Sequence, residues 1–354
     1  MGAIRALVVD DSALMRKLLT EVLNADPEIE VVGTAQDAYV ARDKIKLLNP
    51  DVLTLDVEMP KMDGLTFLKN IMRLRPMPVV MISSLTQKGA EVAMRALDLG
   101  AVDFVGKPKV DITQSMEDCA DEIRTKVRMA ARVPVHLLSG IASHIDTANT
   151  LNEEAVKKTS VKKISECVIA IGASTGGTEA IKEVLMRLPP DSPGIVIAQH
   201  IPPEFSRSFA ERLDRCTRLK VCEAEDGQVI YDGHAYIAPG GRHLEILKKA
   251  SRYVCHVHKG ARVNRHRPSV DVLFDSVAEQ AGSKAVGVIL SGMGRDGAKG
   301  LQLMHSCGAQ TVAQDEQTCV VWGMPRAAVE EGGVDTELPL NDIAKKVTAI
   351  SSAK

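Results

Sequence analysis

The chain contains 354 residues, 45% hydrophobic and 25% charged, which is more than one hydrophobic core normally organises, so we expect two globular domains. Its formal net charge of -2 provides no general attraction to phosphate backbones or anionic lipids, which argues against a nucleic-acid-binding or membrane-surface protein. The apolar runs are too short to span a membrane and no signal-peptide pattern opens the sequence, so we expect a cytoplasmic protein. The seven cysteines form no C-x-x-C pair, and we expect them to be reduced thiols.

Five short apolar runs, each followed by a helical pattern, occupy residues 1–131. We predict strands at residues 4–9, 29–32, 52–55, 79–82 and 102–105. Alternating strands and helices form parallel sheets with right-handed crossovers, and for five strands the usual open order is the flavodoxin-like 2-1-3-4-5. The first domain is therefore predicted to be a flavodoxin-like (βα)5 unit in which strands 1 and 3 are neighbours.

The apolar periodicity fades over residues 132–163, where small, polar and charged residues accumulate. Such a stretch is longer than ordinary connections inside a compact domain. We predict a linker here, with a short helix near residues 151–158.

The alternation resumes in residues 164–354. We predict strands at 168–171, 195–198 and 285–290, helices at 179–188 and 298–305, and a shorter-stranded, antiparallel insertion around 228–258. The second domain is thus expected to be a doubly wound α/β unit with a mostly parallel sheet. Its apolar strands end in loops with glycine or proline, where the active sites of open parallel sheets collect.

Acidic residues gather at the strand ends of the first domain. Asp10 and Asp11 follow the first strand, Asp56 ends the third, and Lys107 follows the fifth. An aspartate at a strand end can simply cap a helix or turn, but adjacent carboxylates repel unless a hard cation such as Mg²⁺ binds between them. The set predicts a magnesium site at which Asp56 accepts a phosphoryl group, with Lys107 offsetting its charge.

These segments resemble the receiver domains of two-component signalling. The resemblance covers residues 4–131 and rests on Val8-Val9-Asp10-Asp11-Ser12, Leu55-Asp56, Met59-Pro60, Asp63-Gly64 and Lys107-Pro108. It implies phosphorylation at Asp56, metal binding by Asp10, Asp11 and Asp56, a switch hydroxyl on Ser83, a switch aromatic at Phe104 and phosphate contact by Lys107. Ser84 remains the alternative to Ser83, because a shift of one residue would place it at the same position.

A glycine-rich loop follows the first strand of the second domain and reads Gly172-Ala173-Ser174-Thr175-Gly176-Gly177. Its glycines permit a sharp turn that presents Ser174 beside a helix N-terminus, where developing negative charge is favoured. Such a loop also suits phosphate or dinucleotide binding, or a plain structural turn. Ser174 is therefore a candidate nucleophile that needs support from other residues.

Two further loops supply that support. His200 follows the strand at 195–198, and Asp296 lies in a glycine loop after the strand at 285–290. A serine becomes nucleophilic beside a histidine base, and a carboxylate orients that histidine and stabilises its protonated form. The order Ser, His, Asp differs from the Ser, acid, His order of α/β-hydrolases, so we do not predict that fold. Asp271 and Asp315 remain alternative acids.

The same loops resemble those of the chemotaxis protein-glutamate methylesterases, the CheB family. The resemblance covers residues 165–350 and rests on Gly172–Gly177, Gln199-His200, His266-Arg267-Pro268-Ser269-Val270-Asp271 and Ser291-Gly292-Met293-Gly294-Arg295-Asp296-Gly297. It implies a Ser174, His200 and Asp296 triad, with Thr175 and the backbone near Met293 at the oxyanion and substrate position. It also implies that no cofactor serves the esterase reaction.

The implied activity is hydrolysis of glutamate methyl esters on the cytoplasmic region of chemoreceptors, with deamidation of receptor glutamines. Methylated receptors and a histidine kinase that donates the phosphoryl group are then the expected partners. Two alternatives compete. One is a receiver joined to a non-catalytic phosphate- or nucleotide-binding module, and the other is a transcription factor, for which this sequence offers no basic recognition helix.

Overall fold

The computed structural model describes residues 2–107, 113–133 and 163–353, and the chain divides into two compact units, Met1–Asn152 and Glu153–Lys354. The helix predicted near residues 151–158 lies outside the described residues. No helix within these three ranges is long and apolar enough to cross a membrane.

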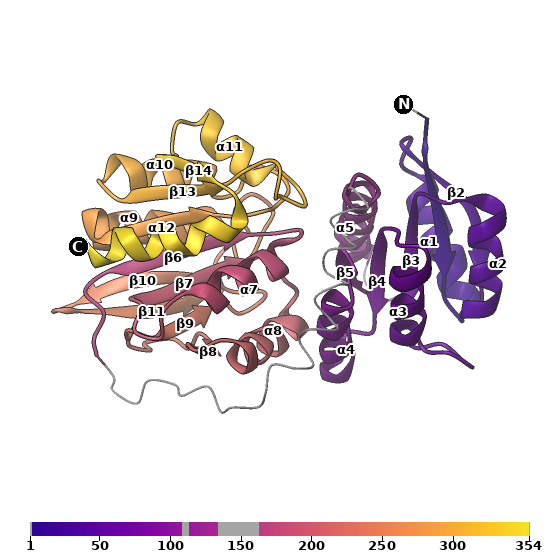
Figure 1. The fold of residues 1–354 in the computed structure, drawn as a ribbon, viewed down its shortest axis with the longest axis horizontal. Coiled ribbons are helices and arrows are strands. Elements are labelled where there is room, and N and C mark those ends of the chain that lie inside the picture. Colours follow the sequence, from indigo (N-terminus) through magenta and orange to yellow (C-terminus); the bar gives the residue numbers. More distant parts are fainter. Residues whose placement is uncertain (1, 108–112, 134–162, 354) are drawn as a thin grey trace. The chain divides into compact units, whose positions relative to one another are not determined.

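The first unit is a five-stranded parallel sheet with the order β2-β1-β3-β4-β5 (Figure 1), which confirms the predicted topology. Its strands are β1 Ile4–Val9, β2 Ile29–Ala35, β3 Val52–Asp56, β4 Val79–Ser83 and β5 Asp103–Gly106. Its helices are α1 Ala13–Asn24, α2 Ala38–Leu48, α3 Gly64–Leu74, α4 Gln87–Asp98 and α5 Thr113–Ala131. Strands β3 and β4 are buried along their whole length, as expected for a parallel sheet covered on both faces.

The polar residues before the helices explain where several of them begin. The side chains of Ser12, Asp37, Asp63 and Thr86 each accept a hydrogen bond from a backbone N–H in the first turn of α1, α2, α3 and α4. These N–H groups have no partner inside the helix, so the caps fix the helix starts. The carboxylates at the ends of β1 and β3 are therefore followed by helices whose first residues are fixed.

The second unit contains a seven-stranded sheet with the order β14-β13-β12-β6-β7-β9-β8, in which every pair is parallel. Its strands are β6 Val168–Ala173, β7 Gly194–Gln199, β8 Lys220–Glu223, β9 His234–Ile237, β12 Ala285–Ile289, β13 Gln310–Gln314 and β14 Thr336–Leu338. The helices are α7 Gly177–Arg187, α8 Pro203–Cys216, α9 Val270–Ala281, α10 Ala298–Ser306, α11 Met324–Glu330 and α12 Leu340–Ser352, with the 3₁₀ turn η1 Gly282–Lys284. In this unit α7 packs beside α12, and α9 packs beside α10 (Figure 1).

The antiparallel insertion is smaller than predicted. Strands β10 His243–Lys249 and β11 Arg252–His258 form an antiparallel hairpin that packs on α9. Strand β9, which lies in the same predicted segment, instead joins the main sheet parallel to β7 and β8. All four of its residues are buried, and β9 lies between β7 and β8 in the sheet.

The strand register positions the three loops singled out in the sequence. Ala173 of β6 pairs with Gln199 of β7, and Gly172 pairs with Ile289 of β12. Parallel strands end at a common edge, so the residues that follow them emerge together. Ser174, His200 and the loop that contains Asp296 therefore share one edge of the sheet.

Candidate functional site

Ser174 is fixed by contacts with the neighbouring loop. It is half-buried, its N–H donates to the Ser291 carbonyl at 3.0 Å, and its own carbonyl accepts from the Gly177 N–H at 2.8 Å. Gly292 lies so close that an added Cβ would sit 2.9 Å from Ser174 Cβ. Only a glycine at position 292 therefore leaves room for the tight turn that carries Ser174.

His200 and Asp296 form a direct pair. His200 Nε2 lies 2.7 Å from Asp296 Oδ2, and both side chains are buried. The other ring nitrogen, Nδ1, is also buried and has no hydrogen-bond partner among the described residues. The ring therefore has one nitrogen committed to the carboxylate and one available for another group.

Asp296 accepts hydrogen bonds from several donors besides His200. They are Asn264 Nδ2 and Ser269 Oγ, each at 2.7 Å, and the backbone N–H groups of Val270 and Asp271, at 2.7 and 3.2 Å. Burial alone would raise the pKa of Asp296, but the hydrogen bond and charge of His200, with the bonds from Asn264 and Val270, hold this pKa well below its ordinary range. Asp296 is therefore a stable carboxylate.

The two competing acids have other partners. Asp271 Oδ1 accepts from the Gly300 N–H at 2.8 Å, and burial raises its pKa. Asp315 Oδ1 accepts from the N–H and hydroxyl of Thr318. Asp296 is the carboxylate that contacts His200.

A tight turn adds a second histidine that sequence reasoning left without a role. Asn264 and Arg265 have φ values of +52° and +69°, and Val263 and His266 exchange two backbone hydrogen bonds across them. The turn brings Asn264 to Asp296 and stacks the ring of His266 on His200, with centroids 3.6 Å apart and planes inclined by 9°. Burial, followed by the nearby His200, lowers the pKa of His266 to about 4.

Gln199 joins the serine and histidine loops. This residue is buried, and its Nε2 donates to the carbonyl of Ser174 at 2.9 Å and to that of His200 at 3.1 Å. The motif Gln199-His200 was visible in the sequence, but its bridging role needed the structure.

Two backbone donors next to Ser174 are available. Within the described ranges, the N–H groups of Thr175 and Met293 donate no hydrogen bond. Thr175 is buried and follows Ser174 in the chain, and Met293 follows Gly292, which packs on Ser174. Unpaired N–H groups in such a place can bind a negatively charged oxygen.

The first unit holds a separate acidic site. Oxygen atoms of Asp10, Asp11 and Asp56 all lie within 4.8 Å of one another, and Lys107 Nζ lies 2.8 Å from Asp56 Oδ2 and 3.2 Å from Asp10 Oδ2. Burial raises the pKa of Asp10, and it raises that of Asp56 to about 6 despite the hydrogen bond from Lys107. Asp10 Oδ2 is buried without a hydrogen-bond partner among the described residues.

The switch candidates lie on β4 and β5. Ser83 is completely buried, and its hydroxyl donates to the Gly89 carbonyl at 2.9 Å, whereas Ser84 is half-buried with its hydroxyl 3.2 Å from Thr86 Oγ1. Phe104 is buried, and Lys126 Nζ lies 5.3 Å from the centre of its ring.

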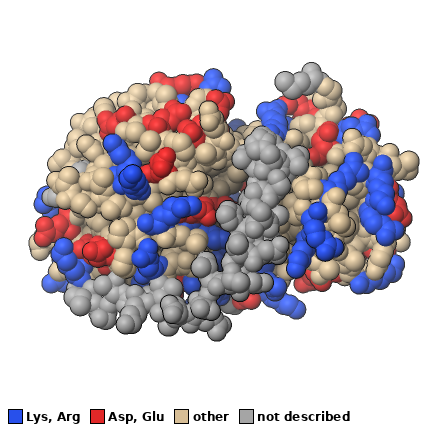
Figure 2. Space-filling model, viewed as in Figure 1, with Lys and Arg blue, Asp and Glu red and all other residues tan. Residues whose placement is uncertain are grey.

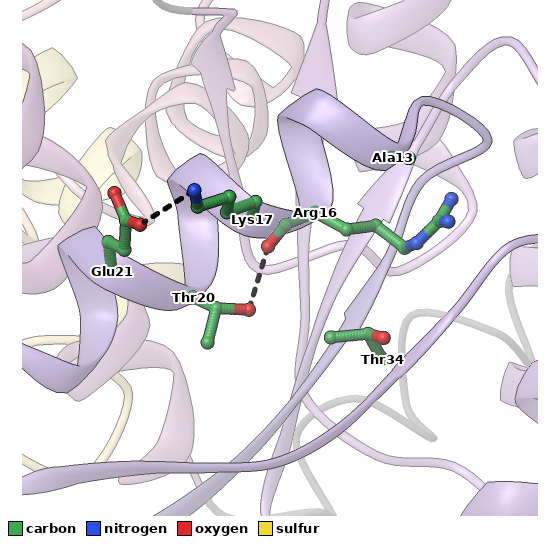
Figure 3. Close-up of a pocket in the computed structure, with 6 residues that line it drawn as sticks. All are labelled: Ala13, Arg16, Lys17, Thr20, Glu21 and Thr34. Carbon is green, nitrogen blue, oxygen red and sulfur yellow. Dashed lines mark hydrogen bonds and ion pairs between the residues drawn. The ribbon is translucent and has the colours of Figure 1, made fainter.

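Arg16 holds the backbone of the loop that carries Asp10 and Asp11. Its guanidinium donates to the carbonyl oxygens of Asp10 and Asp11 at 2.8 and 2.9 Å. Arg16 also lines a hollow beside α1 that contains none of the predicted site residues. Figure 3 shows this hollow, with the Lys17–Glu21 ion pair and the hydrogen bond from Thr20 to the Arg16 carbonyl; its lining residues are Ala13, Arg16, Lys17, Thr20, Glu21 and Thr34.

Together, an acidic site with a lysine on one parallel sheet and a Ser, His and Asp set on another define a response regulator with an enzymatic output unit. The family model for the response regulator receiver domain matches residues 6–117, and the model for the CheB methylesterase matches residues 169–347. The chain belongs to the CheB methylesterase family.

Its relatives match over nearly the whole length. The protein-glutamate methylesterase/protein-glutamine glutaminase of Nitrosomonas europaea is 57% identical over 350 residues, covering 99% of this chain and 97% of the relative. That of Yersinia pestis is 56% identical over 357 residues, covering 100% and 99%. The crystal structure of the Thermotoga maritima CheB methylesterase catalytic domain is 40% identical with a TM-score of 0.52, covering 53% of this chain and 100% of that one. These relatives do not favour a non-catalytic second module.

Proposed function

We propose that this protein hydrolyses glutamate methyl esters on chemoreceptors, and deamidates receptor glutamines, under the control of phosphorylation at Asp56. The observation that carries the catalytic part is the 2.7 Å contact between His200 Nε2 and Asp296 Oδ2 at the sheet edge that also bears Ser174. A buried carboxylate is costly unless it is satisfied, and here it holds a histidine at the sheet edge from which Ser174 also emerges.

In the proposed reaction, His200 Nδ1 removes the proton of Ser174 as Oγ attacks the ester carbonyl of the methylated glutamate. Nδ1 is assigned as the base because Nε2 is occupied by Asp296, the reverse of the orientation in chymotrypsin. The N–H groups of Thr175 and Met293 stabilise the oxyanion. His200 then protonates the departing methanol, and water, deprotonated by the same nitrogen, releases the free glutamate. With a glutamine substrate the leaving group is ammonia.

In the receiver, Asp10, Asp11 and Asp56 fit a magnesium ion. Their clustered oxygens include the buried Asp10 Oδ2, which lies 3.2 Å from Lys107 Nζ, and an all-oxygen donor set suits this cation. When bound, Mg²⁺ would neutralise charge on the phosphoryl oxygens. Lys107 would pair with the phosphorylated Asp56, and Ser83 would exchange the Gly89 carbonyl for a phosphoryl oxygen.

The proposed partners follow from this chemistry. A histidine kinase would donate the phosphoryl group, and the cytoplasmic region of methylated receptors would be the substrate, so the protein would work in the cytoplasm. On the face of the second unit drawn in Figure 2, basic and acidic side chains are interspersed, a pattern that does not suggest a nucleic-acid-binding surface.

The test is methanol release from methylated receptor membranes by the full-length protein, with and without a small-molecule phosphodonor and Mg²⁺. We expect release that the phosphodonor accelerates, and we expect Asp56→Asn to remove only the acceleration. No methanol release under either condition would contradict the proposed activity, and equal acceleration of Asp56→Asn would contradict the proposed phosphorylation site.

A further inference from the structure

A second cluster of metal-ligand residues lies on the β10–β11 hairpin (Figure 1) and shares no residue with the two sites described above. Glu245 of β10 pairs directly with His256 of β11, and His258 lies two residues further along the same face. The three residues each offer a ligand atom, and these atoms all lie within 4.8 Å of one another. Their side chains are between 31% and 38% exposed, so a hydrated ion can reach them.

One ring nitrogen in the cluster forms no hydrogen bond among the described residues. His258 Nε2 is buried and forms no hydrogen bond within the described chain, although Glu245 Oε2 is 3.4 Å away. A buried nitrogen without a hydrogen bond costs free energy, and a metal ion bound by its lone pair would remove that cost.

One ring nitrogen of His256 contacts the carboxylate of Asp226. Its Nδ1 lies 2.9 Å from Asp226 Oδ1, which leaves Nε2 for another ligand. A carboxylate on the far nitrogen orients the ring and increases its basicity, which is the arrangement that accompanies most histidine ligands of zinc. Asp226 is itself fixed by the Val257 N–H at 2.9 Å.

The neighbouring His243 serves a different purpose. Its Nε2 lies 2.8 Å from the Ala261 carbonyl and its Nδ1 accepts from the Ser269 N–H at 3.2 Å, so neither nitrogen is available. Ser269 also donates to Asp296, and the His243 ring lies 5.4 Å from the His258 ring, so His243 lies between the hairpin cluster and Asp296.

We propose that Glu245, His256 and His258 bind a divalent transition metal ion of the zinc class, with water completing the coordination. Two imidazoles and one carboxylate form a donor set that suits zinc, whereas Mg²⁺ prefers oxygen ligands alone. The competing arrangement is a simple ion pair between protonated His258 and Glu245, which needs no metal. A proton and a metal ion would compete for the same nitrogen, so binding should weaken as the pH is lowered.

The experiment titrates Zn²⁺ into the full-length protein by calorimetry, with excess Mg²⁺ to occupy the receiver carboxylates and with Cys307→Ser to remove the exposed thiol. We expect one zinc ion per chain. His256→Gln and His258→Gln should each weaken binding at least about tenfold, and Asp226→Asn by about tenfold through its support of His256. The matched control is His305→Gln, an exposed histidine 3.1 Å from the Asp335 carboxylate, which should bind zinc like the parent.

A second readout guards against misfolded variants. Zinc that binds the folded protein should raise its thermal unfolding temperature, and a chelator should reverse the rise. Variants with the parent's circular dichroism spectrum but no zinc-dependent rise would support the site. Absence of stoichiometric zinc binding by the parent, or undiminished binding by the folded His256→Gln/His258→Gln double variant, would overturn the proposal.

Discussion

The rings of His200 and His266 are stacked with their centroids 3.6 Å apart and their planes inclined by only 9°. With its pKa lowered to about 4, chiefly by burial, His266 is neutral at the pH at which His200 would act. A neutral ring can hold the imidazole of His200 in place without opposing its protonation.

We therefore predict that the shape of residue 266 matters and that a positive charge there is harmful. His266→Phe should keep most of kcat, whereas His266→Ala should lower it up to about tenfold, the size of a lost ring contact. His266→Lys should place a cation beside the imidazolium and shift the acidic limb of the kcat/KM profile to lower pH. Identical pH profiles for all three variants would refute this positioning role.

The acid should matter less than the serine and histidine. Asp296→Asn is expected to lower turnover by roughly 10⁴-fold, because the carboxylate orients and stabilises His200 without forming bonds to substrate. Asp315→Asn is the matched control, since its carboxylate contacts Thr318 and not the histidine. An active Asp296→Asn beside an inactive Asp315→Asn would show that the acid is misassigned.

Asp56 should make the receiver less stable above its own pKa. Burial raises this pKa to about 6, so the folded state holds the proton more tightly than the unfolded chain, and ionisation reduces stability as the pH rises from about 4 to 6. Asp56→Asn should then increase the free energy of unfolding by about 2 kcal/mol at pH 7.5 without Mg²⁺, and by little at pH 4.

Scanning calorimetry of the full chain measures this effect, with the receiver transition identified by its response to Mg²⁺. The ion should stabilise the parent but not Asp56→Asn, and its effect should fade below pH 6 as protons compete. A destabilised Asp56→Asn at pH 7.5 would mean that the carboxylate is already compensated by Lys107.

The receiver is predicted to restrain the hydrolytic unit. The linker predicted from the sequence, roughly thirty residues, would be long enough for the first unit to cover the catalytic edge and leave it, and phosphorylation would need to favour release by only a few kcal/mol. A fragment starting near residue 150 should be faster than the unphosphorylated full chain and insensitive to a phosphodonor. The catalytic domain of the Thermotoga maritima relative was crystallised as a separate chain, which makes the fragment practical. A fragment no faster than the unphosphorylated full chain would exclude simple inhibition by covering.

Local patterns predicted the parts of the site that stand directly at strand ends. The apolar runs marked the ends of the strands, which Asp10, Asp56 and His200 end or follow. A parallel sheet places all the carboxyl ends of its strands at one edge, so these side chains were expected there. For the acid that contacts His200, the sequence favoured Asp296 but left Asp271 and Asp315 as alternatives. The partner of a histidine depends on loop conformation, which the sequence does not show.

Other parts depend on long-range packing. The turn at Asn264 and Arg265 contains no glycine, although both residues have positive φ, so the sequence gives little sign that it brings His266 onto His200. Strand β9 looks like part of an antiparallel insertion until its burial between β7 and β8 is known. The ranges 1–131, 132–163 and 164–354 for receiver, linker and catalytic domain stay predictions.

The most direct test of the account is the rate of methanol release from methylated receptors by Ser174→Ala and His200→Ala, measured beside the parent at equal concentration. Because a serine and its base act as a unit, we predict that each variant loses turnover by the same factor, on the order of 10⁶, while its circular dichroism spectrum is unchanged. Methanol release near the parent's rate by either folded variant would contradict Ser174 as the nucleophile and His200 as its base.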